Sequence, residues 1–230
     1  MNRWLLAGFL LAGCGGPDAN TVTVFAASSL TAPFTQIADI YEQQHPGTTV
    51  AVTFAGSADL VAQLEQGAPA SVLATADEAT MAKAGWASPQ PFATNTMTIV
   101  VPEGNPGEVR GIADLSNPDL TVVICAPQVP CGAATVAVEQ AAGVDIAADS
   151  EESAVADVLG KVSSGQADAG IVYESDLGSA AVTGVVIPDA VNATNTYLIA
   201  ARDARGREFL DTVASEQGQQ VLADDGFGPP

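Results

Sequence analysis

Apolar positions follow two different periods along the chain from residue 21 onward. Runs rich in β-branched residues, spaced as in strands, precede segments in which apolar residues recur every three or four positions, as in amphipathic helices. In the first part of the chain this pattern predicts strands at 21–27, 48–56, 70–76 and 96–102, and helices at 30–44, 57–67 and 77–85. Strands that alternate with helices are typical of βαβ units and a parallel sheet.

The same alternation resumes after residues 102–119, which are rich in turn formers. It predicts strands at 120–127, 167–173, 183–188 and 195–201, and helices at 132–143, at 150–165, opened by Ser150 or Ser153, and at 206–227, ended by Gly226. The interruption indicates two α/β lobes. If the strands at 96–102 and 195–201 both cross between them, lobe 1 comprises 21–98 and 197–230, lobe 2 comprises 99–196, and a cleft lies between.

The N-terminus has the features of an export signal. Arg3 precedes an apolar run that is too short to span a bilayer, and the run ends in Leu-Ala-Gly-Cys at 11–14, which resembles a bacterial lipobox. We therefore expect a signal peptide at 1–13, a lipid on Cys14 and a tether at 14–20; a plain secretory signal is the alternative. Both place the protein outside the cytoplasm, on the outer side of the cytoplasmic membrane or in the periplasm.

Export bears on the two remaining cysteines. Cys125 and Cys131 flank a short segment with two prolines, and an oxidising compartment favours a disulfide between them. His45 is the single histidine and no third free thiol is left, so the sequence offers too few ligands for a metal site. We expect no cofactor.

The charge and the missing catalytic motifs exclude several classes of protein. With 27 acidic and 7 basic residues, the net charge is −20, and such a surface repels nucleic acid. The sequence holds no G-x-S-x-G elbow, P-loop or G-x-G-x-x-G motif, and its many carboxylates are expected on the surface. We therefore expect a binding protein and not an enzyme.

Small polar residues recur where a strand gives way to a helix. Ser28 and Ser29 follow the first predicted strand, Ser57 the second and Cys131 the fifth. Helix N-termini present unpaired N–H groups and a positive dipole end, which together suit an anion. Taken alone, each serine is also consistent with an ordinary helix cap. Three such termini at the carboxyl ends of parallel strands, however, indicate a ligand site.

Three segments carry a family resemblance. VFAASSLT (24–31), FAGSADLVAQLEQGAPASVLATAD (54–77) and ADAGIVYESD (167–176) together resemble the substrate-binding proteins of molybdate ABC transporters, with similarity from Val22 to Phe227. The resemblance implies a two-lobed class II periplasmic-binding-protein fold, in which two hinge strands join lobes built on mostly parallel sheets. It also implies a monomer that captures molybdate, and tungstate of nearly equal size, for a permease and its ATPase.

In that family neutral groups hold the tetrahedral oxyanion. Carried over by position, the donors are Ser29 and Ser57 through hydroxyl and N–H, Cys131 and Val155 through the backbone N–H, and Tyr173 through its phenol, with Ser28 secondary. Cys131 departs from the family, which usually has alanine there. A disulfide to Cys125 would fix the loop that presents this N–H.

Other receptors of this fold remain as alternatives: one for sulfate, thiosulfate or phosphate, or a lipid-anchored scaffold with a vestigial cleft. A phosphate receptor often uses a carboxylate to accept the proton of its ion; Asp59 is near Ser57 but is expected in a helix's first turn, where it stabilises the dipole. A ferric-ion receptor needs adjacent tyrosines, and Tyr41, Tyr173 and Tyr197 are far apart in the sequence.

Overall fold

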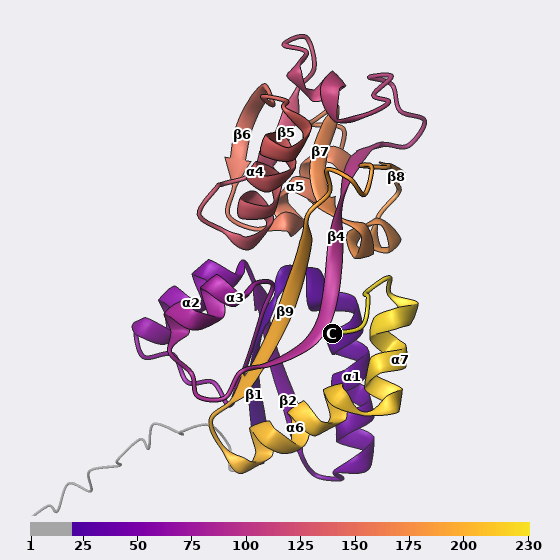
Figure 1. The fold of residues 1–230 in the computed structure, drawn as a ribbon. Helices are drawn as coiled ribbons and strands as arrows, with labels where there is room; N and C mark the ends of the chain where they lie inside the picture. Colours follow the sequence, from indigo (N-terminus) through magenta and orange to yellow (C-terminus); the bar gives the residue numbers. More distant parts are fainter. Residues whose placement is uncertain (1–19) are drawn as a thin grey trace, which may run out of the picture.

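The computed structural model describes residues 20–230, which form two α/β halves stacked one above the other (Figure 1). We call the part with β1–β3 the lower half and the part with β5–β8 the upper half. The predicted signal peptide and the lipid-bearing Cys14 lie outside the described residues. Within residues 20–230, no helix is both long enough and apolar enough to cross a bilayer.

Two strands link the halves. β4 (Gln90–Pro102) and β9 (Thr194–Ala201) pair antiparallel and run from the lower half into the upper half (Figure 1). In the lower half the strand order is β2-β1-β3-β9-β4; in the upper half β4 continues beside β7, β5 and β6, with β8 on its other edge. The other strands are β1 (Thr21–Ala27), β2 (Thr49–Ala55), β3 (Val72–Thr75), β5 (Val122–Cys125), β6 (Ala148–Glu152), β7 (Ala169–Tyr173) and β8 (Val182–Val185).

Pairing is parallel away from the linking strands and antiparallel along them. β1 pairs parallel with β2 and β3, and β5 pairs parallel with β6 and β7, as βαβ connections require. The carboxyl ends of β1, β2 and β3 therefore point toward the upper half, so that loops from the lower sheet converge where the halves meet.

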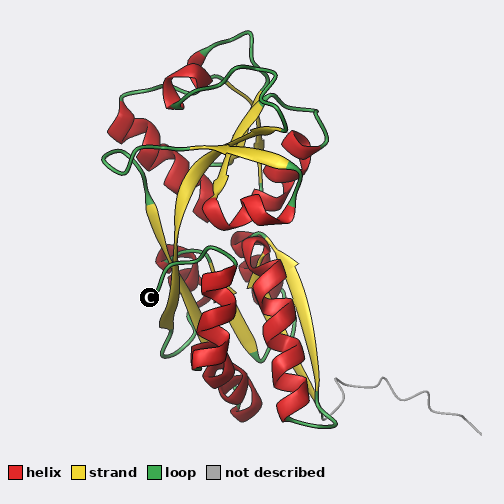
Figure 2. Cartoon of the chain, turned by 90° about the vertical axis from the view of Figure 1, so that its right-hand side faces the viewer, coloured by secondary structure: helices red, strands yellow, loops and turns green. Residues whose placement is uncertain are grey.

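Helices cover the sheets, and the long helices of the lower half run toward the upper half (Figure 2). Their bounds are α1 (Thr31–Gln44), α2 (Ser57–Glu65), α3 (Glu78–Ala84), α4 (Pro130–Ala142), α5 (Val155–Ser163), α6 (Ala204–Ala214) and α7 (Glu216–Asp224). α1 shows why the periodicity predicted it: Phe34, Ile37 and Tyr41 are buried, whereas Thr31 and Thr35 are exposed.

One predicted helix begins in the wrong place. The sequence pattern predicts that this helix begins at Ser150 or Ser153. In the structure residues 148–152 form β6, and the helix α5 starts at Val155, with Ala154 as its N-cap. β6 is largely polar and partly exposed, and it becomes a strand because β5 offers it a hydrogen-bonding edge. Tertiary pairing overrides the local pattern here.

The C-terminal helix is two helices and not one. The predicted span 206–227 breaks at Ser215, whose ψ of 161° is not helical. The hydroxyl of Ser215 accepts a hydrogen bond from the backbone N–H of Gly218 at 3.1 Å, which caps the new helix α7. A serine cap inside an amphipathic pattern therefore marks a turn that periodicity alone does not reveal.

Candidate functional site

A small cavity lies where the two halves meet. Residues 27–29, 56–57 and 76 line it from the lower half, and residues 130–131, 153–155 and 173 line it from the upper half. The cavity brings together all the predicted site residues, namely Ser28, Ser29, Ser57, Cys131, Val155 and Tyr173. Every described residue of the lining is uncharged.

The size of the cavity restricts the class of ligand. Its volume is about 20 Å³, on a scale where one water molecule needs about 10–15 Å³. A sugar or an amino acid is far larger than this space. The site as it stands therefore suits a compact inorganic ion and not an organic metabolite.

Three helices begin at the cavity with uncapped N-termini. α2, α4 and α5 show no side-chain cap hydrogen bond in the described structure, so N–H groups of their first turns lack a helical partner. Pro130, at the first position of α4, has no N–H, which makes the N–H of Cys131 the first donor of that helix. These termini aim backbone donors and dipole ends at the cavity.

The hydroxyl of Ser57 is oriented by a neighbouring peptide. Ser57 is buried, and its Oγ accepts a hydrogen bond from the backbone N–H of Ala76 at 3.1 Å. Ser57 follows β2 and Ala76 follows β3, so loops after the two strands that flank β1 support each other. Because Oγ accepts from the protein, its own proton remains to be donated toward the cavity.

Ser29 bonds to a tyrosine that the sequence did not single out as a site residue. Its Oγ lies 2.9 Å from the hydroxyl of Tyr197 on β9, and either atom can be the donor. The rings of Tyr197 and Tyr173 pack edge-to-face at 5.8 Å between centroids. Tyr173 and Tyr197 are far apart in the sequence, but in the structure they are neighbours, because β7 and β9 both pair with β4.

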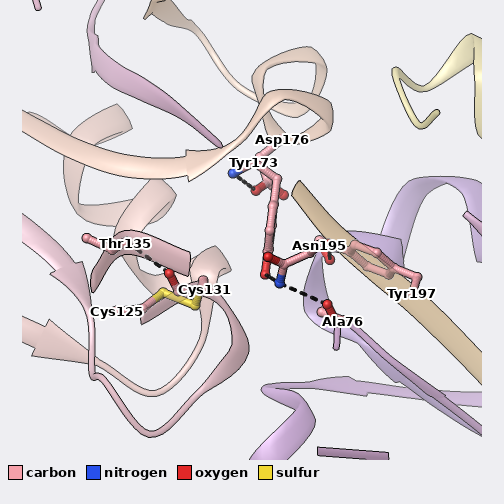
Figure 3. The surroundings of a disulfide bond; sticks show 9 residues. Ala76, Cys125, Cys131, Thr135, Tyr173, Asp176, Asn195 and Tyr197 are labelled. Atoms are coloured by element: carbon pink, nitrogen blue, oxygen red, sulfur yellow. Dashed lines mark hydrogen bonds between the residues drawn. A yellow bond between two sulfur atoms is a disulfide. The ribbon is translucent and has the colours of Figure 1, made fainter. Parts of the chain in front are cut away.

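Tyr173 presents a neutral hydroxyl that its neighbours hold in place (Figure 3). It is buried, and its hydroxyl accepts a hydrogen bond from Asn195 Nδ2 at 2.9 Å. Burial raises the pKa of Tyr173 well above its ordinary value, and the nearby Tyr197 and Asp176 add to the rise. The phenol therefore stays protonated at neutral pH.

A buried carboxylate supports the backbone of Tyr173. Asp176 accepts a hydrogen bond from the Tyr173 N–H at 2.9 Å. Burial raises the pKa of Asp176 to about 7; the Tyr173 N–H opposes the rise, and the charge of Asp225 adds to it. Burial likewise raises the pKa of Asp225 to about 6. Asp176 is not among the described residues that line the cavity.

The halves touch at the rim of the cavity. A Cβ added at Gly56, which precedes α2, would collide with the carbonyl oxygen of Ser153 on the upper half. Only a residue without a side chain allows the N-termini of α2 and α5 to approach this closely. Gly56 therefore sets the distance between donors from opposite halves.

A disulfide joins Cys125 at the end of β5 to Cys131 in the first turn of α4 (Figure 3). Cys131 also accepts a hydrogen bond from the Thr135 hydroxyl through its carbonyl, at 2.9 Å. The crosslink ties the N-terminus of α4 to the sheet on which it packs. The donor N–H of Cys131 thus has a covalently restrained position.

The lining does not suit a metal cation. In residues 20–230 no group of three or more His, Cys, Asp and Glu side chains is placed to hold a metal ion. Asp59 lies in the first turn of α2, as expected, and is not among the described lining residues. Neutral hydroxyls, N–H groups and dipole ends favour an anion instead.

Sequence reasoning missed the residues behind the donors, and one signal could have found them. Along the predicted strand 195–201, Asn195 falls on the same face as Tyr197 and Ile199, and all three are buried. An asparagine on a buried face requires partners for its amide. The period-2 pattern therefore indicated a polar network at this strand.

Sequence comparisons relate the chain to known binding proteins. A family model for bacterial extracellular solute-binding proteins matches residues 22–228. The molybdate-binding protein ModA of Mycobacterium tuberculosis is 44% identical over 251 residues, which cover 100% of this chain and 96% of that protein. ModA of Escherichia coli is 34% identical over 103 residues, which cover 42% of this chain and 40% of that protein.

Solved structures share the fold at low sequence identity. The periplasmic molybdate-binding protein of Azotobacter vinelandii aligns with a TM-score of 0.75 at 20% identity, over 91% of this chain and 99% of that one. The sulfate-binding protein SubI of M. tuberculosis aligns with a TM-score of 0.78 at 19% identity, over 91% and 87%. These likenesses confirm the predicted periplasmic-binding-protein fold.

Family membership also settles the broad class of activity. Extracellular solute-binding proteins of ABC transporters are exported receptors and not enzymes, so the predicted export and non-enzymatic role are confirmed at that level. The full-length match at 44% identity narrows the relationship further. The chain belongs to the bacterial extracellular solute-binding proteins and, within them, to the family of the molybdate-binding proteins ModA.

Proposed function

We propose that this chain is the molybdate receptor of an ABC transporter and that it holds the ion in the cavity between its halves. The observation that carries the proposal is the cavity itself, whose lining combines hydroxyls with uncapped helix N-termini and contains no charged residue among those described. The identity of 44% to ModA over the full length favours molybdate over other oxyanions of similar charge.

Five donors hold the ion in this proposal. Hydroxyls donate from Ser29, Ser57 and Tyr173, and backbone N–H groups donate from Cys131 and Val155, with Ser28 secondary. Hydrogen bonds to an ionised acceptor are roughly twice as strong as neutral ones. In a protein of net charge −20, such short-range donors in the cavity between the halves replace the long-range attraction that its surface lacks.

The donor set also determines which ions are rejected. Hydrogen phosphate carries a proton that needs an acceptor, and no carboxylate is among the described residues of the lining. Sulfate carries no proton but is smaller than molybdate, so a rigid cage leaves some of its hydrogen bonds long. Tungstate has nearly the size of molybdate, and we expect it to bind as well.

Delivery to the transporter completes the proposal. The chain is exported, anchored by a lipid on Cys14, and acts as a monomer that hands the ion to a membrane permease driven by its ATPase. Lobe 1 comprises 21–98 and 197–230 and lobe 2 comprises 99–196, with β4 and β9 as the hinge. The passage of both strands from one sheet to the other supports this division.

The test is calorimetric titration of the chain that begins after Cys14. We expect tight one-to-one binding of molybdate and tungstate, and no heat from sulfate or phosphate at the same concentrations. Heat from sulfate or phosphate alone would assign the protein to one of those receptor classes. If none of the four ions gave binding heat, the protein would be a scaffold with a vestigial cleft, and the proposal would be overturned.

A further inference from the structure

A continuous path of hydrogen bonds connects the donors of the two halves behind the cavity. The Ala76 N–H donates to Ser57 Oγ at 3.1 Å, and the Ala76 carbonyl accepts from Asn195 Nδ2 at 2.9 Å. The same Nδ2 donates to the hydroxyl of Tyr173 at 2.9 Å. Asn195, on the linking strand β9, is therefore the one residue of this path that bonds to both halves (Figure 3).

The chemistry of Ala76 fixes the orientation of the Asn195 amide. A backbone carbonyl can only accept, so the amide atom that faces Ala76 is the nitrogen and not the oxygen. That nitrogen has two protons, one for Ala76 and one for Tyr173. Asn195 is buried, so water does not offer the amide an alternative orientation.

The fixed amide determines what Tyr173 can do. Because the hydroxyl oxygen already accepts from Asn195, its own proton has to be donated elsewhere. Two acceptors compete for it: the neighbouring Tyr197 and an ion in the cavity that Tyr173 lines. An anion is the stronger acceptor, so it accepts the hydrogen bond from the Tyr173 hydroxyl.

We propose that Asn195 is a positioning residue that makes Tyr173 an obligate donor to the ligand, and thereby restricts the site to oxyanions without a proton. This inference rests on the proposed function, because it concerns the same cavity. Asn195 does not line the cavity among the described residues, so it acts through Tyr173 and not by contact with the ion. Without it, the Tyr173 hydroxyl can rotate and accept a hydrogen bond from a protonated ligand.

The test is a double-mutant cycle between Asn195→Ala and Tyr173→Phe, with molybdate affinity measured by calorimetry. N195A alone should weaken molybdate binding about 10- to 100-fold, the range expected for a hydrogen bond to a charged group. In the Y173F background the same substitution should change affinity less than about twofold, because the hydroxyl that it orients is gone. An effect of N195A that persists in full without the Tyr173 hydroxyl would overturn the proposal.

A second readout separates orientation from stability. N195A should narrow the affinity ratio between molybdate and hydrogen phosphate, since a rotated Tyr173 hydroxyl can accept a hydrogen bond from the phosphate O–H group. An unchanged ratio would count against the proposal. Should N195A fail to fold, Asn195→Ser, which is too short to reach both partners, takes its place in the cycle.

A matched control is Asn192→Ala. Asn192 Nδ2 donates to the Met97 carbonyl at 2.9 Å and its Oδ1 accepts from the Met97 N–H at 3.2 Å, and it is not among the described lining residues. N192A should lower the melting temperature and leave molybdate affinity within about twofold of the parent. If the parent itself binds no molybdate, the proposed function fails; if it binds and only the cycle fails, the role of Asn195 alone is wrong.

Discussion

The two halves of the molecule supply hydrogen-bond donors of different kinds to one cavity. The lower half presents two serine hydroxyls, Ser29 and Ser57, each bonded to a neutral partner. The upper half presents the N-termini of α4 and α5 at Cys131 and Val155, and among its predicted donors only Tyr173 uses a side chain. The lower half contributes one uncapped helix N-terminus, that of α2, and the upper half two, so the upper half depends more on where its backbone lies.

The two halves are therefore vulnerable to different kinds of change. A hydroxyl is lost with a single substitution, whereas an N–H group survives almost any substitution and is lost only when its helix moves. In the upper half the supports of the backbone are therefore the sensitive points: the contact of Ser153 with Gly56 and the buried Asp176 behind Tyr173.

The largest expected effect is loss of the lower-half hydroxyls. S29A and S57A should each weaken molybdate binding by about 1.5–3 kcal/mol, or roughly 10- to 150-fold, and the double variant by about a hundredfold or more. Isothermal titration calorimetry measures both. Thr35→Ala, which removes an exposed hydroxyl from α1, is the control and should leave affinity unchanged. Unaltered binding in the double variant would refute the role of the lower half.

The second effect is the pH dependence of stability set by Asp176. Its native pKa of about 7 is above the unfolded value of about 3.9, so the native state holds the extra proton between those values. Stability therefore falls as pH rises from 4 to 7 and is level above. Asp176→Asn should remove a change on the order of 4 kcal/mol across that window.

Urea denaturation of D176N and the parent at pH 4 and at pH 8 measures this change. The difference in unfolding free energy between the two proteins should favour D176N more at pH 8 than at pH 4. Asp225, whose pKa burial raises to about 6, acts in the same direction and is present in both proteins. An equal difference at both pH values would show that Asp176 is not the source of the pH dependence of stability.

The third effect concerns the contact between the halves. Gly56→Ala places a methyl group against the Ser153 carbonyl, so the halves cannot approach as closely and the donors from α2 and α5 no longer converge. We expect molybdate affinity to fall about 10- to 100-fold with little change in the melting temperature. Gly160→Ala is the control, because Gly160 lies within α5 and an added Cβ would meet no nearby atom. Gly67→Ala is unsuitable, because Gly67 has a φ of 90°.

The smallest effect on affinity should come from the disulfide. Replacing Cys125 and Cys131 with serine removes a crosslink over a short loop and should lower stability by about 2 kcal/mol. The donor N–H of Cys131 is kept, since it belongs to the backbone of α4, so molybdate affinity should change less than about threefold. Chemical denaturation measures the change in stability, and calorimetry measures the change in affinity. A loss of affinity as large as that of S57A would mean that the crosslink itself shapes the site.

Local patterns in the sequence were sufficient for much of the fold. The period of apolar residues predicted β1, α1 and their successors because each element's burial follows from its own spacing. It failed at β6, whose polar residues become a strand only through pairing with β5, and at Ser215, where a side-chain cap divides α6 from α7. Both failures are places where a hydrogen-bond partner, and not hydrophobicity, decided the outcome.

The candidate site shows the same division. The positions of Ser29, Ser57 and Cys131 after strands placed them at helix N-termini, and the family resemblance added Val155 and Tyr173. Nothing in the sequence order linked Ser29 to Tyr197, which lies 168 residues later. The helix N-termini at Ser57 and Cys131 were accessible to sequence reasoning. The pattern of the strand at 195–201 indicated that Asn195 needs partners, but it did not identify those partners.

Neighbours along the chain are enough to fix the alternation of strands and helices, the helix N-termini at the strand ends, the cysteine pair and an uncharged set of donors, so these features were predictable. The contact of Tyr173 with Tyr197, the bonds of Asn195 to Ala76 and Tyr173, and the close approach of Gly56 to Ser153 were not. They depend on how the sheets assemble in space, because β4 and β9 carry residues of both halves past one another.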